Sequence, residues 1–194
     1  MEGSIFIAGA GVQWLRDRMK FFKKAPETEK IVKSLQNNND IYLVPAFTGL
    51  GAPYWDANAR GVLSGITRDT SPKEIVRATI EAVAYQTHDL FEAMKHDGLR
   101  PKIVKVDGGM VMNNWFSQFL SDIVNVKVLR PKVQETTALG AAFMAGLQIG
   151  VYKSLKDISK NWRLDKKFLP KMKNKSRSVL IKGWEKAVKR ALIN

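Results

Sequence analysis

The stretch Val104-Lys-Val-Asp-Gly-Gly-Met-Val-Met-Asn-Asn114 carries the clearest structural pattern of the chain. Its branched residues predict a short strand that ends at Asp107, and two glycines then precede apolar residues at helical spacing from Met112 to Ile123. A strand, a glycine turn and a helix bring free backbone N–H groups and a helix N-terminus to an anion or a ribose. The glycines permit positive φ and leave no side chain in the way. An ordinary strand-to-helix turn is the alternative that these residues alone leave open.

Outward from this stretch, strands and helices are expected to alternate. A first helix begins near Gly9 or Gly11 and ends by Pro26, and a long loop rich in proline and glycine covers 48–60. Apolar periodicity predicts further helices at 27–35, 71–95, 113–124, 135–147 and 179–192, and strands at 41–47, 102–106 and 127–129. This alternation predicts a sheet covered by helices.

Two of the expected helices have distinctive sequences. Ser71-Pro-Lys-Glu74 is typical of a helix start, with serine as the N-cap, proline in the first turn and glutamate at the third position. The helix at 135–147 consists largely of alanine and glycine. Because glycine costs about 1 kcal/mol relative to alanine inside a helix, we expect another backbone to pack closely against this helix and compensate.

Composition limits the class of protein. The 194 residues are long enough for one domain with a full core, and 45% hydrophobic with 26% charged residues is a globular composition. The absence of cysteine excludes disulfides, thiolate metal sites and cysteine nucleophiles. No apolar run is long enough for a transmembrane helix, and Glu2 stands where a signal peptide needs basic residues. We therefore expect a cytoplasmic protein without membrane insertion.

The net charge of +14 is concentrated at the C-terminal end. Residues 151–194 contain 14 Lys and Arg against three Asp and Glu. The lysines are spread among apolar residues, without aromatics interleaved for base stacking and without a recognised nucleic-acid module. A solvated basic face is the expected role, and polyanion binding is the alternative. We expect no specific nucleic-acid partner.

Five segments, taken together, resemble the C-terminal half of the FGGY carbohydrate kinases, and the glycerol kinase branch most closely. The resemblance covers 3–192. These segments are Ala8-Gly-Ala-Gly-Val-Gln-Trp14, Val44-Pro-Ala-Phe-Thr-Gly-Leu-Gly-Ala-Pro-Tyr-Trp-Asp56, Arg60-Gly-Val-Leu-Ser-Gly-Ile66, Val106-Asp-Gly-Gly109 and Thr136-Thr-Ala-Leu-Gly-Ala-Ala142.

The resemblance implies an α/β fold of the ribonuclease-H-like type, as in the actin and hexokinase superfamily. It implies that residues 1–194 form a partial C-terminal, nucleotide-binding domain with a basic C-terminal segment at 151–194. In such domains a meander of three antiparallel strands comes first. Here Gly3–Ile7 is expected to be the end of the third of these strands, so that the domain lacks its leading strands.

The resemblance also implies a nucleotide site. Gly9 and Gln13 match family residues beside the phosphates and ribose, and Gly109 and Asn113 match residues that contact the adenosine. ATP with Mg²⁺ is the implied cofactor. Asp107 is open to two interpretations: hydrogen bonding to the ligand or to a magnesium-bound water, or capping of its own turn.

The activity implied by the family is transfer of the ATP γ-phosphate to glycerol. No metal ligand is expected in this chain. No catalytic residue is expected either, because the family's Asp-Gln-Gln segment, with the aspartate that takes the proton of glycerol, does not occur in it. ATP or ADP is thus the expected partner, glycerol only together with an N-terminal half, and a homo-oligomer is the expected assembly. The alternative is a non-catalytic module, derived from such a kinase, that binds adenine nucleotide or another protein.

Overall fold

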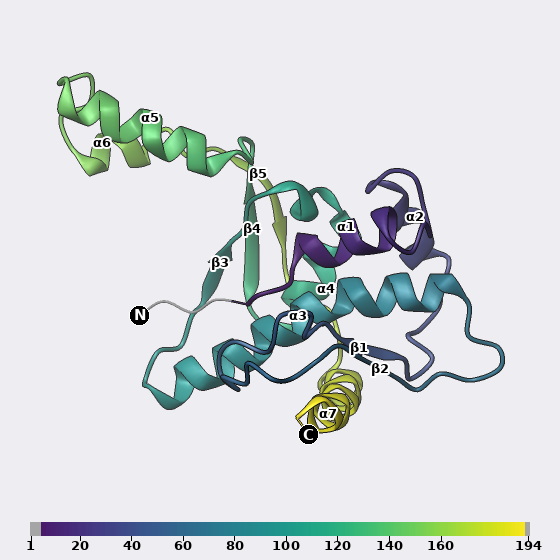
Figure 1. Ribbon diagram of the computed structural model, residues 1–194. Helices are drawn as coiled ribbons and strands as arrows, with labels where there is room; N and C mark the ends of the chain where they lie inside the picture. Colours follow the sequence, from purple (N-terminus) through teal and green to yellow (C-terminus); the bar gives the residue numbers. More distant parts are fainter. Residues whose placement is uncertain (1–4, 193–194) are drawn as a thin grey trace.

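The computed structural model describes residues 5–192 and is shown in Figure 1. Its α-helices are α1 (Gly9–Asp17), α2 (Glu27–Lys33), α3 (Pro72–His96), α4 (Asn114–Val124), α5 (Thr136–Gln148), α6 (Leu155–Ser159) and α7 (Asn174–Ala191). Its strands are β1 (Tyr42–Val44), β2 (Val62–Ser64), β3 (Ile103–Lys105), β4 (Lys127–Pro131) and β5 (Leu164–Phe168), and a short 3-10 helix, η1 (Gly109–Met112), follows β3. None of the helices in this described range is long and apolar enough to cross a membrane.

The strands form two small sheets. β1 and β2 are an antiparallel pair, with Leu43 opposite Leu63. β3 and β4 are parallel and are connected through η1 and α4, and β5 adds an antiparallel strand beside β4, so the order is β3-β4-β5. Helices α3 and α7 pack against the β1–β2 pair, and α4 packs against β4 and β5.

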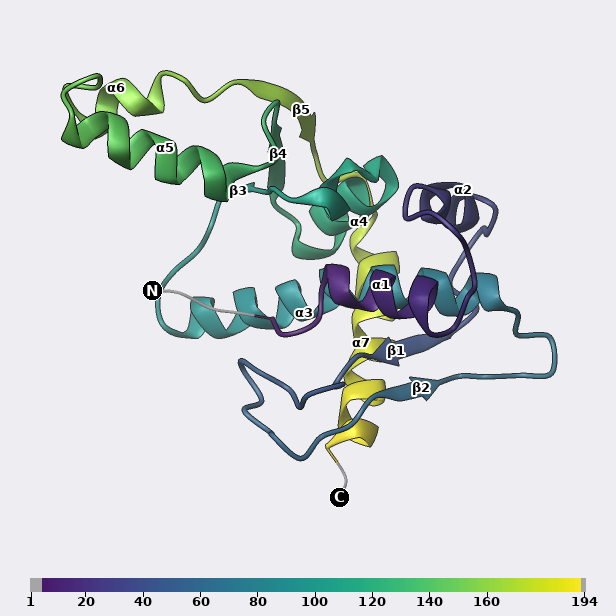
Figure 2. The ribbon, with the colours of Figure 1, turned by 45° about the horizontal axis from the view of Figure 1, so that its top comes forward.

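Helix α3 lies at the centre of the molecule, and α1, α2, α4 and β1 all pack against it (Figures 1 and 2). Its start is the predicted capping box: the Ser71 side chain accepts from Lys73 N–H, and the Glu74 carboxylate accepts from Ser71 N–H. Thirteen of its residues are buried. A buried helix of this length fixes where α1 and α4 stand relative to each other, and therefore positions the site described below.

Buried polar groups on α3 are paired. Arg77 Nε donates to Glu81 Oε1 at 2.6 Å, and the Tyr85 hydroxyl donates to the other carboxylate oxygen at 2.9 Å. Burial raises the pKa of Glu81, against the opposing effect of the Arg77 guanidinium. One turn after Tyr85, Asp89 accepts from the Tyr54 hydroxyl at 2.8 Å and from the indole N–H of Trp184 on α7 at 2.6 Å. These bonds connect the 48–60 loop and α7 to the central helix.

Two expectations are wrong in the described region. Ile5–Ile7 do not form a strand, and the remainder of that expected strand, Gly3 and Ser4, lies outside the described residues. Helix α5 does not have a close backbone neighbour: a Cβ on Gly140 would meet nothing within 4 Å, and only Gly146 is tightly packed, against the Tyr152 ring. The α5–α6 segment instead extends away from the rest of the molecule (Figure 1).

Other boundaries differ less. Strands β2 and β5 were not expected, and α7 begins five residues before the expected position. Strand β5 was missed because three of its five residues are charged and all but Phe168 are exposed, so no apolar alternation marks the strand in the sequence. Backbone pairing with β4 and the ion pair between Asp165 and Arg130, at 2.7 Å, hold β5 in place.

Candidate functional site

A cavity of about 330 Å³ lies between the start of α1, the start of α2 and the turn that follows β3. All four residues that the sequence placed in a site line it: Gly9, Gln13, Gly109 and Asn113. The structure therefore brings together two pairs of residues that are about one hundred positions apart in the chain. The volume of the cavity is at the lower end of the range of small-molecule binding sites.

The first wall of this cavity is the N-terminus of α1. The N-cap residue, Ala8, has no side-chain group to cap the helix. Within the described chain, the N–H groups of Gly9 and Ala10 make no hydrogen bond, whereas Gly11 N–H donates to Ala8 O at 3.0 Å. A Cβ on Gly9 would meet nothing within 4 Å. Free N–H groups and the positive end of the helix dipole favour an anion here.

The second wall is the glycine turn. Gly108 adopts φ of +83°, and its N–H donates to Gln134 O at 3.1 Å, while Gly109 has no positive φ and begins η1. Side chains on either glycine would point into open space. The turn is also held by Asp107, whose carboxylate accepts from the Thr136 hydroxyl at the start of α5. The structure thus gives Asp107 a bond that connects its own turn to α5.

Polar side chains stand at the third wall. Asn113 is the N-cap of α4, and its Oδ1 accepts from Phe116 N–H at 3.0 Å. Glu29 accepts from Lys33 at 2.5 Å and from Asn114 N–H at 3.4 Å. Burial alone would raise the pKa of Glu29, but these bonds hold it below its ordinary value.

Apart from Arg16, which pairs with the neighbouring Asp17 at 2.6 Å, the rest of the lining is mostly apolar. Sequence reasoning did not assign these apolar residues to a site. Their periodicity indicated only helix packing or a helix end, and no sequence signal separates a core methionine from one at the mouth of a cavity. These residues are Val12, Ala25, Pro26, Ile80, Met110 and Met112. Thr28 was also missed, and its contacts are described below.

Metal ligands were tested on the same residues. In the range 5–192 no group of three His, Asp or Glu side chains is close enough to hold an ion. The cavity has a single carboxylate, Glu29, which Lys33 and Asn114 already engage. For comparison, Mg²⁺ is usually held in proteins by one or two carboxylates together with substrate phosphates.

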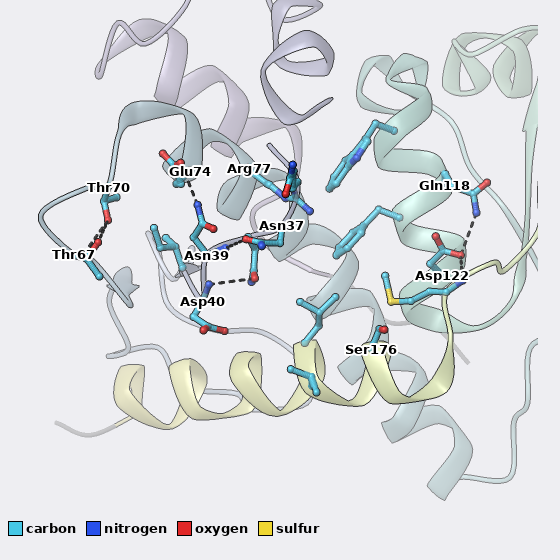
Figure 3. Close-up of a pocket in the computed structure, with 18 of the residues that line it drawn as sticks. Asn37, Asn39, Asp40, Thr67, Thr70, Glu74, Arg77, Gln118, Asp122 and Ser176 are labelled. Carbon is cyan, nitrogen blue, oxygen red and sulfur yellow. Dashed lines mark hydrogen bonds between the residues drawn. The ribbon is translucent and has the colours of Figure 1, made fainter. Parts of the chain in front are cut away.

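A second and larger cavity, of about 1160 Å³, lies between the loop at 36–41, α3, α4 and α7 (Figure 3). Many of the polar side chains around it bond to one another: Asn39 to Glu74, Thr67 to Thr70 and Gln118 to Asp122. None of the four predicted residues lines it. The smaller cavity combines an uncapped helix start, bare glycine backbone and an apolar wall. We therefore take it, and not the larger cavity, as the candidate ligand site.

Comparison with known proteins defines the class to which this fold belongs. Residues 1–149 match the C-terminal domain of the FGGY family of carbohydrate kinases. The chain belongs to this family. Its fold is correspondingly the α/β, ribonuclease-H-like fold expected for a C-terminal domain of the actin and hexokinase superfamily.

Within the family, the similarity is to glycerol kinases. The chain is 55% identical over 190 residues to glycerol kinase 1 of Pseudomonas aeruginosa and 53% identical over 193 residues to glycerol kinase of Clostridium botulinum. These matches cover 98% and 99% of the chain, but only 38% and 39% of the relatives. The chain thus spans somewhat more than a third of the length of these curated relatives.

Solved structures agree. A crystal structure of Plasmodium falciparum glycerol kinase with ADP superposes with a TM-score of 0.87 at 39% identity, covering 99% of this chain and 38% of that one. Xylulose kinase from Lactobacillus acidophilus superposes with a TM-score of 0.79 at 24% identity, covering 97% of this chain and 38% of that one, which shows the shared fold alone.

Proposed function

We propose that this chain binds an adenine nucleotide in the 330 Å³ cavity, as the nucleotide-binding part of a kinase that transfers the ATP γ-phosphate to glycerol. The observation that carries the proposal is the convergence of Gly9, Gln13, Gly109 and Asn113 on one cavity beside an uncapped helix start. The similarity to glycerol kinases, one of them solved with ADP, supports both the ligand and the acceptor.

Each wall has a role in this proposal. The free N–H groups of Gly9 and Ala10 receive phosphate oxygens, because they are donors at the positive end of α1. The bare backbone of Gly109 lets the adenosine approach closely, and Met112 on η1 offers an apolar surface to the base. Gln13, whose exposed side chain makes no hydrogen bond within residues 5–192, is free to contact the ribose or phosphates.

Mg²⁺ enters this proposal with the nucleotide and not through a cage of protein carboxylates. We propose that the phosphates bring the ion, and we assign no step to it. The group that removes the proton from glycerol is proposed to lie outside residues 1–194. The whole chain, including the basic segment 151–194, is proposed to act as one partial nucleotide-binding domain; the family match over 1–149 supports the placement of the segment boundary.

The test uses the isolated 194-residue chain and ADP. In ¹H–¹⁵N correlation spectra, ADP should shift the amide resonances of Gly9, Gln13, Gly109 and Asn113 and leave those of the larger cavity, such as Asp40 and Ser176, in place. Incubation with ATP, Mg²⁺ and glycerol should give no glycerol 3-phosphate. Shifts confined to the larger cavity would contradict the nucleotide site. Turnover at ordinary kinase rates, roughly 1–100 per second, would contradict the placement of the proton acceptor.

A further inference from the structure

Helix α2 holds the start of α4 at two adjacent points. The Asn113 amide donates from Nδ2 to Thr28 Oγ1 at 3.4 Å, and Asn114 N–H donates to Glu29 Oε2, also at 3.4 Å. Thr28 is 4% exposed and lines the 330 Å³ cavity. These contacts join residues that are 85 positions apart in the sequence.

The Thr28 hydroxyl has one donor partner and one acceptor partner, and these two roles cannot be exchanged. Its hydroxyl donates its single proton to Ala25 O at 2.7 Å, so toward Asn113 its oxygen acts as an acceptor. At the other end of the amide, Asn113 Oδ1 accepts from Phe116 N–H at 3.0 Å. A flipped amide would place its NH₂ group against the Phe116 N–H, and its carbonyl against a hydroxyl whose proton is already used. The orientation of the Asn113 amide is therefore fixed from both ends.

We propose that Thr28 is a positioning residue for nucleotide binding, which fixes Asn113 as a hydrogen-bond donor toward the cavity. One of the two Nδ2 protons bonds to Thr28, and the other remains for a ligand. A ligand that presents an acceptor, such as a ring nitrogen of the base or a ribose oxygen, suits this arrangement. Because the Asn113 side-chain amide is already fixed, it loses little rotational freedom when a ligand binds, which reduces the entropic cost of binding. The inference rests on the proposed nucleotide site and adds a residue that the family resemblance did not supply.

The test compares ADP affinities of variants of the full 194-residue chain by calorimetry. Thr28→Val, which removes the acceptor, should weaken ADP binding roughly tenfold, in line with the loss of one hydrogen bond. Thr28→Ser, which keeps the hydroxyl, should restore the wild-type affinity. The matched control is Thr87→Val, because Thr87 makes the same kind of bond, to Val83 O at 2.7 Å, on α3 and outside the cavity. It should bind ADP as the wild type does.

A second variant keeps the test decisive if Thr28→Val unfolds. Asn113→Asp retains the capping oxygen for α4 but has no N–H to donate, so it should fold and also bind ADP roughly tenfold more weakly. In wild-type spectra, the two Asn113 side-chain N–H resonances should be well separated, and in Thr28→Val they should move toward each other.

The outcomes separate two failures. If the wild type binds ADP and either folded variant, Thr28→Val or Asn113→Asp, binds it equally well, the positioning role is wrong and the nucleotide site stands. If the wild type does not bind ADP, the proposed function fails, and the role of Thr28 fails with it.

Discussion

At the scale of single residues, the two glycines after β3 have different tasks. Gly108 carries the left-handed backbone of the turn, with φ of +83°, whereas Gly109 does not have positive φ. The sequence indicated that both could adopt such a conformation, in which a branched side chain at Gly109 would be strained. The structure removes that objection for Gly109, because a Cβ there would point into open space.

Gly109→Val therefore tests the ligand surface without a backbone penalty. The branched side chain should occupy the place of the adenosine and weaken ADP binding at least tenfold, while the free energy of unfolding changes by less than about 1 kcal/mol. Calorimetric titration with ADP and a thermal melt measure the two effects. Gly140→Val is the matched control, since Gly140 is also open and lies on α5, away from the cavity. Equal ADP affinity in Gly109→Val and the wild type would contradict the site.

The predictability of the site also differs among residues. That Gly9, Gln13, Gly109 and Asn113 lie together could be expected beforehand, because the family resemblance assigns all four to one site, and all four line the 330 Å³ cavity. Thr28 could not be named, since its proposed role depends on a contact with Asn113 across 85 positions, and nothing in the α2 sequence indicates that contact. Sequence reasoning finds residues that carry motifs more readily than residues that position them.

At the scale of elements, local signals predicted best. The Ser71-Pro-Lys-Glu74 box is confirmed as the start of α3, because every bond in it lies within four residues. Strand β2 was missed because three residues are too few to show a strand pattern, and its place is fixed by pairing with β1. The close packing expected for α5 was wrong. Small residues allow another backbone to approach a helix closely, but they do not show that this chain supplies such a neighbour.

The capping box also predicts a pH dependence. Burial raises the pKa of Glu74, but hydrogen bonds from Ser71 outweigh it and hold the pKa below its ordinary value. A lowered folded-state pKa contributes stability that is fully present above the unfolded pKa, about 4.3, and is lost as the pH falls through the folded value. Glu74→Gln should cost about 1 kcal/mol of unfolding free energy at pH 6, and the difference from the wild type should shrink toward pH 3. Melting curves at both pH values measure this. If the difference in unfolding free energy between the wild type and Glu74→Gln were the same at both pH values, the charge of the Glu74 carboxylate would not contribute to the stability of the cap.

At the scale of the whole molecule, charge and packing are unevenly distributed. Most of the net charge of +14 lies after Gly150, and α7 turns its apolar side chains, among them Trp184 and Val188, into the core while its lysines are exposed. Stability is expected to be uneven too. α3 is buried along most of its length, whereas the segment from α5 to α6 leaves large apolar side chains such as Met144, Ile149 and Leu155 between 52% and 77% exposed.

We therefore expect α5 to open far more often than α3. A helix of 13 residues without substantial packing is marginal in water, and segments with few buried contacts open at little cost in free energy. In hydrogen exchange measured by mass spectrometry, peptides from 136–148 should exchange within seconds, and those from 76–86 should be protected for hours. Gly140→Ala should slow exchange in α5 alone, because alanine favours the helix by about 1 kcal/mol and Gly140 has room for the added carbon. Protection of α5 equal to that of α3 would mean that the exposed face of α5 is covered in solution, and a second copy of the chain is the first occupant to test, by repeating the exchange at tenfold lower protein concentration.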